Sequence, residues 1–354
     1  MEEKKDTLGM LDLVIRPGFC VKENQIIKVN QAAESLFITP GTDVRSLLLT
    51  GSEEYAAFTG GCLYLTLSLS SHSCGASVTR VDDIDVFLLE QESDNGELRS
   101  MALAARELRE PLTNVMITAD SLFPLCAAES SPRTAEQVAR LNRGLFQILR
   151  IIGNMSDAER CAAVSHQETV DIPALFAEFF EKAETLVSHT GITLTYEGPD
   201  QPIYGLADRE QLERAVLNIL SNAIKFTPKG GTVTAKLTRS GRMLRLSVTD
   251  SGSGIAQSVR SSVFSRYLRQ PALEDSRYGI GLGMVLIRTA AAHHGGAVLI
   301  DQPDGAGTRI TMTMSIRQSK QATLRSNVLR VDYAGERDHG LIELSECLPT
   351  ELYE

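Results

Sequence analysis

The sequence predicts a multidomain α+β protein with three folded parts and a C-terminal tail. Short apolar stretches separated by turns fill the first 92 residues, and heptad-spaced apolar residues fill 97–158. Helix-like and strand-like segments then alternate from 161 to 316. Because periods of two and 3.6 residues distinguish strands from helices, we expect an α/β domain, a helical hairpin and an α/β sandwich, in that order.

Residues 1–92 form the first expected domain. Its strand-like stretches are QIIKVN, CLYLTLSLS and VDDIDVFLLEQE. The run ENQIIKVNQAAESLF, at 23–37, is similar to the start of a PAS sensor domain, and the closing strand fits that resemblance. The resemblance implies a sensor role, whereas no signal or ligand follows from the sequence.

Residues 93–160 are expected to form two helices joined by SSPRT. Apolar residues recur in alternating steps of three and four, at Met101, Ala105, Leu108, Leu112, Val115, Ala119 and Leu122, and at Val138, Leu141, Leu145, Ile148, Ile152 and Met155. Such seams are typical of coiled-coil-like bundles. Two helices cannot bury both seams alone, so we expect a homodimer with a four-helix bundle. Packing against the first domain is the alternative.

Residues 161–318 are expected to form an α/β sandwich, a mixed sheet covered on one face by helices. Its expected strands are ITLTYEG, TVTAKLTRS, MLRLSVTD, AVLIDQP and RITMTMSI. Residues 319–354 are a tail, and its apolar stretches VLRVDY and LIEL would either add strands or dock elsewhere.

A helix within the sandwich carries a candidate site for a metal and a phosphate. Asn218 and Asn222 are four residues apart and share one helix face, with Lys225 three residues further. Amide oxygens are hard ligands that suit Mg²⁺, and a lysine is a point charge for phosphate. A surface helix with two solvated asparagines is the alternative, which the poor helix propensity of asparagine disfavours.

Two glycine-bearing loops follow that helix. Asp250 ends an apolar strand and could accept a hydrogen bond from an exocyclic amine, while Gly252 and Gly254 would let the backbone approach a planar ligand. The second loop opens a helix, whose free amides suit phosphate, with Gly279, Gly281 and Gly283. Neither a P-loop motif nor a strand before these glycines occurs, which argues against P-loop and Rossmann sites. The ordered set predicts an ATP site.

These segments resemble the motif boxes of sensor histidine kinases, within the superfamily that includes gyrase-type ATPases. The resemblance implies ATP and Mg²⁺ as cofactors and a transferase of two-component signalling. Asn218, Asn222 and Lys225 match the N box, with Asn222 as the Mg²⁺ ligand, and Asp250, Gly252 and Gly254 match the G1 box, where the aspartate reads adenine. Phe264 resembles the F box, Gly279, Gly281 and Gly283 the G2 box, and Gly305, Gly307 and Thr308 a last glycine box. Arg266 and Arg269, in the implied ATP lid, are either phosphate contacts or solvated charges.

The segment ARELREPLTNV, at 105–115, resembles the phosphoacceptor H box but departs from it at two positions. Arg106 stands where the family has its histidine, followed by the matching Glu107, and Glu110 stands where the family has threonine or asparagine. A guanidinium has no free lone pair and stays protonated, so Arg106 cannot attack a phosphoryl group. Glu110 likewise replaces the group that, in the family, orients water for dephosphorylating a response regulator.

Three functional hypotheses remain open. The first is a degenerate sensor histidine kinase that binds Mg-ATP and signals as a homodimer, as a heterodimer with an intact kinase, or to a response regulator. The second is an active kinase with another acceptor, either in a partner or at His166 or His189. The third is a superfamily ATPase or an anti-sigma-type serine kinase, against which the heptad helices argue.

The composition of the chain argues against several other classes of protein. The net charge of −10 over 354 residues argues against a general nucleic-acid binder. No apolar run approaches the roughly 18 residues of a membrane span, and the N-terminus lacks a signal-peptide pattern. The six cysteines form no CxxC pair and are expected to be reduced thiols. We therefore expect a soluble, cytoplasmic protein.

Overall fold

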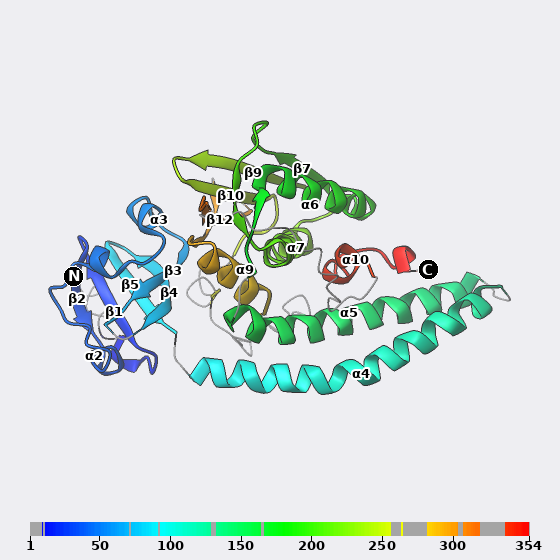
Figure 1. The fold of residues 1–354 in the computed structure, drawn as a ribbon, viewed down its shortest axis with the longest axis horizontal. Coiled ribbons are helices and arrows are strands. Elements are labelled where there is room, and N and C mark those ends of the chain that lie inside the picture. The colour runs from blue at the N-terminus through cyan, green and yellow to red at the C-terminus, as the bar shows by residue number, and fades with distance from the viewer. Residues whose placement is uncertain are drawn as a thin grey trace.

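A computed structural model of the chain describes its architecture in four parts (Figure 1). It describes residue 9 and residues 11–70, 72–90, 93–128, 132–163, 166–255, 263–264, 282–303, 307–318 and 337–353. The N-terminal strands lie at one end, and a long helical hairpin extends away from them. A second set of strands with its helices lies along the hairpin, and the C-terminal segment lies between these helices and the hairpin.

The first part, which we call the N-terminal unit, comprises residues 11–90. Its strands are β1 (Gly18–Lys22), β2 (Gln25–Val29), β3 (Cys62–Ser68), β4 (Ser73–Val81) and β5 (Ile84–Leu89), and its short α-helices are α2 (Gln31–Glu34) and α3 (Ser52–Ala56). The strands pair antiparallel in the order β2-β1-β5-β4-β3. Phe19 and Phe87 stack at 4.7 Å in the core and are fully buried. The unit is α/β as expected, whereas its assignment as a PAS domain stays a prediction.

Helices α4 (Ser93–Ala128) and α5 (Pro132–Ala163) form the hairpin. Pro111 lies inside α4, which continues through it and is curved in Figure 1. The heptad seam splits into two stripes of residues seven apart. One stripe is buried, with Ala105, Leu112, Ala119, Leu145 and Ile152, and the other is exposed, with Leu108, Val115, Leu122, Leu141 and Ile148.

The described part of residues 168–315 contains a second group of strands and three long helices. The helices are α6 (Ile172–Val187), α7 (Arg209–Phe226) and α9 (Leu282–His293), and the strands are β7 (Thr193–Glu197), β9 (Thr232–Ser240), β10 (Met243–Asp250), β11 (Val298–Asp301) and β12 (Thr308–Ser315). Strands β6 (Glu168–Asp171) and β8 (Tyr204–Ala207) form a separate pair. β7 runs parallel to β9 and the other neighbours are antiparallel. Alternate residues of β9 are buried, so one sheet face packs on the helices and the other meets solvent.

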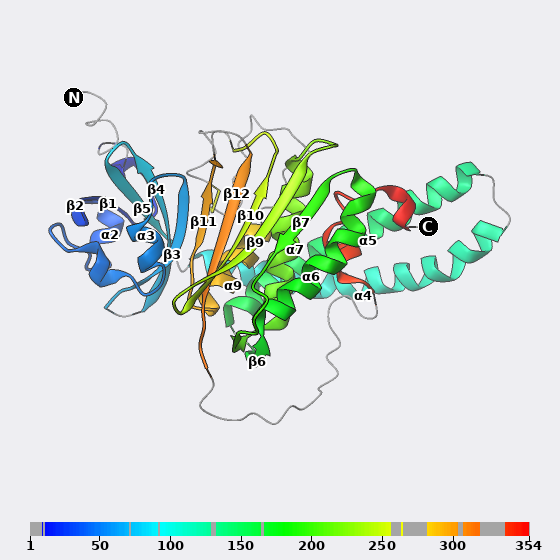
Figure 2. The same cartoon turned by 90° about the horizontal axis from the view of Figure 1, so that it is seen from above.

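The two groups of strands form one sheet of ten strands, in the order β2-β1-β5-β4-β3-β11-β12-β10-β9-β7. Strand β3 of the N-terminal unit pairs antiparallel with β11, placing Tyr64 opposite Val298 and Cys62 opposite Ile300. Figure 2 shows β3 beside β11. Each group thereby covers an edge that the other would expose, and an unpaired edge is a site for unwanted association.

The C-terminal segment, residues 337–353, packs between α5, α6 and α7. It contains the short helix α10 (His339–Glu343) and a 3₁₀ turn, η5 (Thr350–Tyr353). The stretch LIEL lies in α10 and the residue after it, so it docks and adds no strand, while VLRVDY lies outside the described residues. Ile342, Leu344, Leu348 and Tyr353 belong to the same core as the hairpin and the second group of strands. None of the helices in the described part of the chain is both long enough and apolar enough to span a membrane.

The approach of β3 to β11 gives a stability prediction. Gly61, just before β3, has a φ of 89°, and a Cβ there would overlap the carbonyl oxygen of Ile300. We expect Gly61→Ala to lower the free energy of unfolding by about 1–2 kcal/mol, because a non-glycine residue is strained at this φ. Gly60→Ala is the control, since nothing lies within 4 Å of its added Cβ. Urea denaturation measures both, and equal midpoints would contradict the prediction.

Candidate functional site

Helix α7 positions the candidate metal and phosphate residues, and its first turn is held firmly. Asp208 caps the helix by accepting from the backbone N–H of Gln211 at 3.2 Å. The N–H of Asp208 donates to Nε2 of His294 at 3.0 Å, while Nδ1 of that ring lies 2.7 Å from the carbonyl oxygen of Ala290. This pairing requires a neutral ring with its proton on Nδ1. Burial lowers the pKa of His294, which favours that neutral form.

Asn218, Asn222 and Lys225 come from the same helix, as predicted, but their environments differ. Asn218 is 1% exposed, and its Nδ2 donates to the carbonyl oxygen of Arg214 at 2.9 Å. Its Oδ1 has no hydrogen-bond partner among the described residues, and a Cβ at Gly283 would lie 2.6 Å from it. Asn222 and Lys225 are half-buried. A buried, unpartnered amide oxygen is costly, which marks this side of α7 as a place for a ligand.

Asp250 lies at the end of β10 and is 8% exposed. Its Oδ1 accepts from the backbone N–H groups of Gly252, at 2.8 Å, and Thr308, at 3.2 Å. Burial raises the pKa of Asp250, and these two donors partly oppose that rise. Gly307 has a φ of 68°, and its N–H donates to the carbonyl oxygen of Gly252 at 3.1 Å. The predicted first and last glycine loops therefore meet at one carboxylate.

The remaining predicted residues are placed only in part. Gly254 has a φ of 74°, which suits glycine, and Gly283 lies in the first turn of α9. Gly279, Gly281, Gly305, Arg266 and Arg269 lie outside the described residues.

Phe264 belongs to a cluster that the sequence did not indicate. Arg288 of α9 donates through Nη1 to the carbonyl oxygen of Phe264 at 3.0 Å. Its guanidinium also lies 4.9 Å from the ring centroid of Tyr64 and pairs with Glu90 at 2.5 Å. Tyr64 donates to Glu90 at 3.0 Å. Tyr64 and Glu90 belong to the N-terminal unit, so the cluster joins that unit to α9 and to Phe264.

A second unpredicted cluster joins the hairpin, α7 and the C-terminal segment. Arg150 of α5 donates to Ser221 at 3.1 Å and pairs with Glu343 at 3.4 Å and Glu346 at 3.1 Å. Arg214 of α7 pairs with Glu343 at 3.1 Å, with Asp157, and donates to Asn154 at 2.7 Å. The segment also reaches two predicted residues, as Glu343 lies 3.4 Å from Nδ2 of Asn218 and Glu346 pairs with Lys225 at 2.8 Å. No motif marks these charges, because they come from three segments distant in sequence.

Comparison with known proteins agrees with this geometry. Residues 207–318 match the family of histidine kinase-, DNA gyrase B- and HSP90-like ATPases. An uncharacterized sensor-like histidine kinase of Rhizobium meliloti is 28% identical over 276 residues, covering 73% of this chain and 52% of that protein. The adaptive-response sensory kinase SasA of Synechocystis is 30% identical over 224 residues, covering 61% of this chain and 58% of the relative. The predicted resemblance to the sensor histidine kinase family is confirmed.

A solved structure supports the likeness in fold. The full-length kinase ShkA, solved in complex with AMPPNP, aligns with a TM-score of 0.51 at 22% identity, over 70% of this chain and 54% of that one. The chain thus spans about half to two thirds of the length of the relatives that it matches. Its ATP-binding domain is of the histidine-kinase type.

The described residues fit the nucleotide that this family implies. Asn218 leaves its buried Oδ1 unpartnered, and the loops around Asp250 place backbone where side chains would clash: a Cβ at Gly252 would overlap the carbonyl oxygen of Phe226. Close backbone approach of this kind suits a flat ligand.

The residues of the degenerate H box lie on α4 and face solvent. Arg106, Glu107 and Glu110 are all exposed. In this histidine kinase homologue, position 106 is therefore accessible on the hairpin surface, and the residue there is an arginine.

Proposed function

We propose that this protein is a sensor histidine kinase homologue that binds Mg-ATP but does not phosphorylate its own hairpin at position 106. The combination of an exposed Arg106 with a domain of the ATP-binding type at residues 207–318 carries this proposal. A guanidinium remains protonated and offers no lone pair to a phosphoryl group, whatever its exposure. Signalling then proceeds through conformation and association.

In this proposal, different residues of the site contact the adenine, the Mg²⁺ ion and the phosphates. Asp250 is the acceptor for the exocyclic amine of adenine, since its carboxylate is buried at a strand end between two glycine loops. Asn222 supplies an amide oxygen to Mg²⁺, and Lys225 a positive charge to the phosphates. Gly283, in the first turn of α9, contributes a backbone N–H group, and the family resemblance assigns the same role to Gly279 and Gly281. Bound Mg-ATP would supply the phosphoryl group or the conformational energy of signalling.

Dimerisation through the hairpin is also part of the proposal. The stripe containing Leu108, Val115 and Leu122 is about half exposed, at 50%, 51% and 50%. Apolar residues seven apart on neighbouring helices are what a four-helix bundle buries. A homodimer would cover this stripe, as would a heterodimer with an intact kinase, and either form would present the hairpin to a response regulator.

The remaining assignments rest on the same proposal. We assign residues 1–92 to a PAS-like sensor, 93–160 to the dimerisation hairpin, 161–318 to the ATP-binding domain and 319–354 to a tail. A cytoplasmic location is favoured because Cys20, Cys62, Cys74 and Cys347 carry free thiols, which reducing compartments maintain.

Nucleotide binding can be tested with Asn222→Asp. A carboxylate beside the phosphates should repel them, so we expect Mg-ATP affinity to fall at least about tenfold, or about 1.4 kcal/mol. Asn114→Asp is the matched control, because it adds the same charge to the exposed surface of α4. Isothermal titration calorimetry measures both variants. An unchanged affinity in Asn222→Asp would show that the N-box assignment is wrong.

Phosphotransfer can be tested with γ-labelled ATP. We expect no acid-labile, alkali-stable label on the wild type and a label on Arg106→His, where an imidazole would stand beside Glu107. Arg109→His is the control: it lies about one turn further along the same helix and should stay unlabelled. A labelled wild type would refute the proposal, and loss of that label in His166→Ala or His189→Ala would locate the acceptor. If Arg106→His binds Mg-ATP but stays unlabelled, the residue at position 106 is not the only cause of the missing phosphorylation.

Dimerisation can be tested with Val115→Glu, which places a charge in the middle of the exposed stripe. We expect the wild type to sediment as a dimer and the variant as a monomer at micromolar concentration, because a charge cannot be buried there unpaired. Ile117→Glu is the control, as Ile117 is 60% exposed but lies off the stripe. A monomeric wild type, or equal behaviour of the two variants, would argue against this interface.

A further inference from the structure

The C-terminal segment, residues 337–353, lies between the hairpin helix α5 and the helix α7, which carries the candidate metal and phosphate residues. Four buried apolar residues anchor it: Ile342, Leu344, Leu348 and Tyr353. Asn142 and Arg143 of α5 donate to its backbone, at the carbonyl oxygens of Tyr353 and Ser345, each at 2.8 Å. The segment is therefore docked by specific contacts along its length.

Its two acidic side chains, the buried Glu343 and the partly exposed Glu346, face the cations of the site. Glu343 is fully buried and reaches Arg150, Arg214 and Asn218, while Glu346 pairs with Lys225 and Arg150. Burial alone would raise the pKa of Glu346, but Arg150 and Lys225 prevail and hold it below its usual value. Both side chains are thus acidic groups matched to cations.

The charges of this cluster balance only while the segment is docked. Arg150, Arg214 and Lys225 supply three positive charges, and Asp157, Glu343 and Glu346 supply three negative ones. Withdrawal of residues 337–353 would remove two of the three carboxylates. The groove would then hold a surplus of positive charge beside Asn218 and Lys225, which suits a polyphosphate.

We infer that the C-terminal segment is an intramolecular competitor of the nucleotide, its Glu343 and Glu346 carboxylates taking the place of phosphate groups at Asn218 and Lys225. This inference rests on the proposed Mg-ATP site and states how access of Mg-ATP to that site is regulated. Because the docked segment also contacts α5, it clamps the ATP-binding domain to the hairpin, and Mg-ATP binding releases both. Arg337, at the start of the segment, pairs with Asp120 and extends the clamp to α4.

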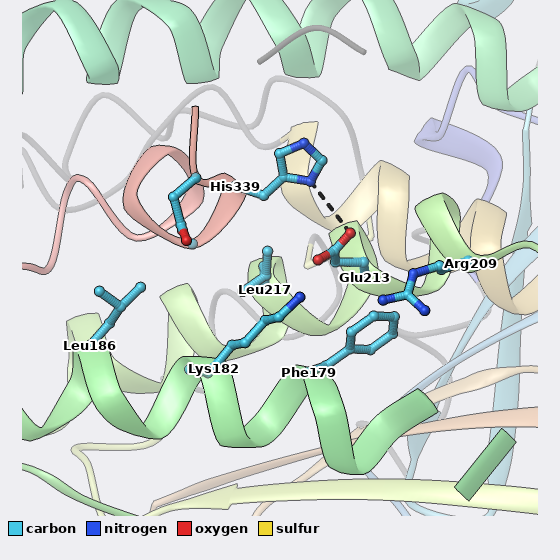
Figure 3. A pocket seen from close by; sticks show the side chains of 10 residues that line it. Phe179, Lys182, Leu186, Arg209, Glu213, Leu217 and His339 are labelled. Atoms are coloured by element: carbon cyan, nitrogen blue, oxygen red, sulfur yellow. Dashed lines mark hydrogen bonds and ion pairs between the residues drawn. The ribbon is translucent and has the colours of Figure 1, made fainter. Parts of the chain in front are cut away.

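The start of the C-terminal segment borders a pocket. A cavity of about 300 Å³ remains between α6, α7 and the start of the segment, lined by Phe179, Lys182, Ala183, Leu186, Arg209, Glu213, Leu217, Asp338, His339 and Gly340. Figure 3 shows His339 above this cavity, joined to Glu213, with Lys182 and Phe179 below.

Binding affinity gives the first test. Glu346→Gln, in the full-length chain, should tighten Mg-ATP binding at least about fivefold, because a larger fraction of molecules would have an open site. Glu351→Gln is the matched control: it removes the same charge from the same segment, but Glu351 is exposed. Circular dichroism of both variants checks that they fold.

Thiol labelling of the wild type gives a second test that needs no substitution. Cys347 lies 3.4 Å from the carbonyl oxygen of Ser221, and burial raises the pKa of its thiol, so the docked form should react slowly with a maleimide. Mg-ATP should speed its labelling severalfold, as read by peptide mass spectrometry, whereas adenosine, which lacks phosphates, should not. Cys74 is an internal control, as it is equally half-buried and burial raises its pKa to about 12.

The outcomes separate this inference from the proposed function. Tighter binding in Glu346→Gln with faster Cys347 labelling under Mg-ATP supports it, as does binding by Glu346→Gln when the wild type binds nothing. Equal Mg-ATP affinity in all three proteins, with unchanged or slower Cys347 labelling, overturns the inference alone. No binding by any of the three overturns the proposed function and the inference together.

Discussion

Two buried guanidinium groups fix how the hairpin, the ATP-binding domain and the C-terminal segment sit together. Arg150 comes from α5 and Arg214 from α7, and both are under 10% exposed. A charge removed from water needs an opposite charge and good hydrogen bonds, or it destabilises the fold by several kcal/mol. Glu343 pairs with both arginines at once. The two buried arginines need carboxylates from other segments, and this need holds the hairpin, α7 and the C-terminal segment in one arrangement.

The same requirement explains the composition of the site. Lys225 and Asn218, which a nucleotide would contact, lie at the edge of this network and share its carboxylates. A site built only for ATP would leave these groups to solvent or ligand. Here they have an internal partner in the C-terminal segment, which lies outside residues 207–318, the range that matches the ATPase family.

Much of the fold could be predicted from the sequence because its periodic segments are long. The alternation in MLRLSVTD and the heptads of α4 and α5 correspond to β10 and to the hairpin. Likewise, the spacing of Asn218, Asn222 and Lys225 placed them on one helix, and Asp250 with Thr308 lies where two glycine loops meet. Local patterns determine such features.

Contacts between distant segments could not be predicted in this way. Nothing in CLYLTLSLS indicates that β3 pairs with β11, since an edge strand and an inner strand have the same alternation. Glu343 in LIEL reads as the polar residue of a short apolar stretch, and Arg288 as one charge on a helix, until the partners are known. Arg266 and Arg269 of the predicted lid lie outside the described part of the chain, as do Gly279 and Gly281.

The sheet that crosses from the N-terminal unit into the ATP-binding domain has a mechanical consequence. Neighbouring strands of a sheet share their twist, because the ladder of hydrogen bonds between them is nearly rigid. A ligand or signal that altered the twist of β3 would therefore also turn β11, and β11 is paired with β12, whose first residue, Thr308, holds Asp250. The N-terminal unit is thus two strand pairings away from the strand whose first residue contacts Asp250.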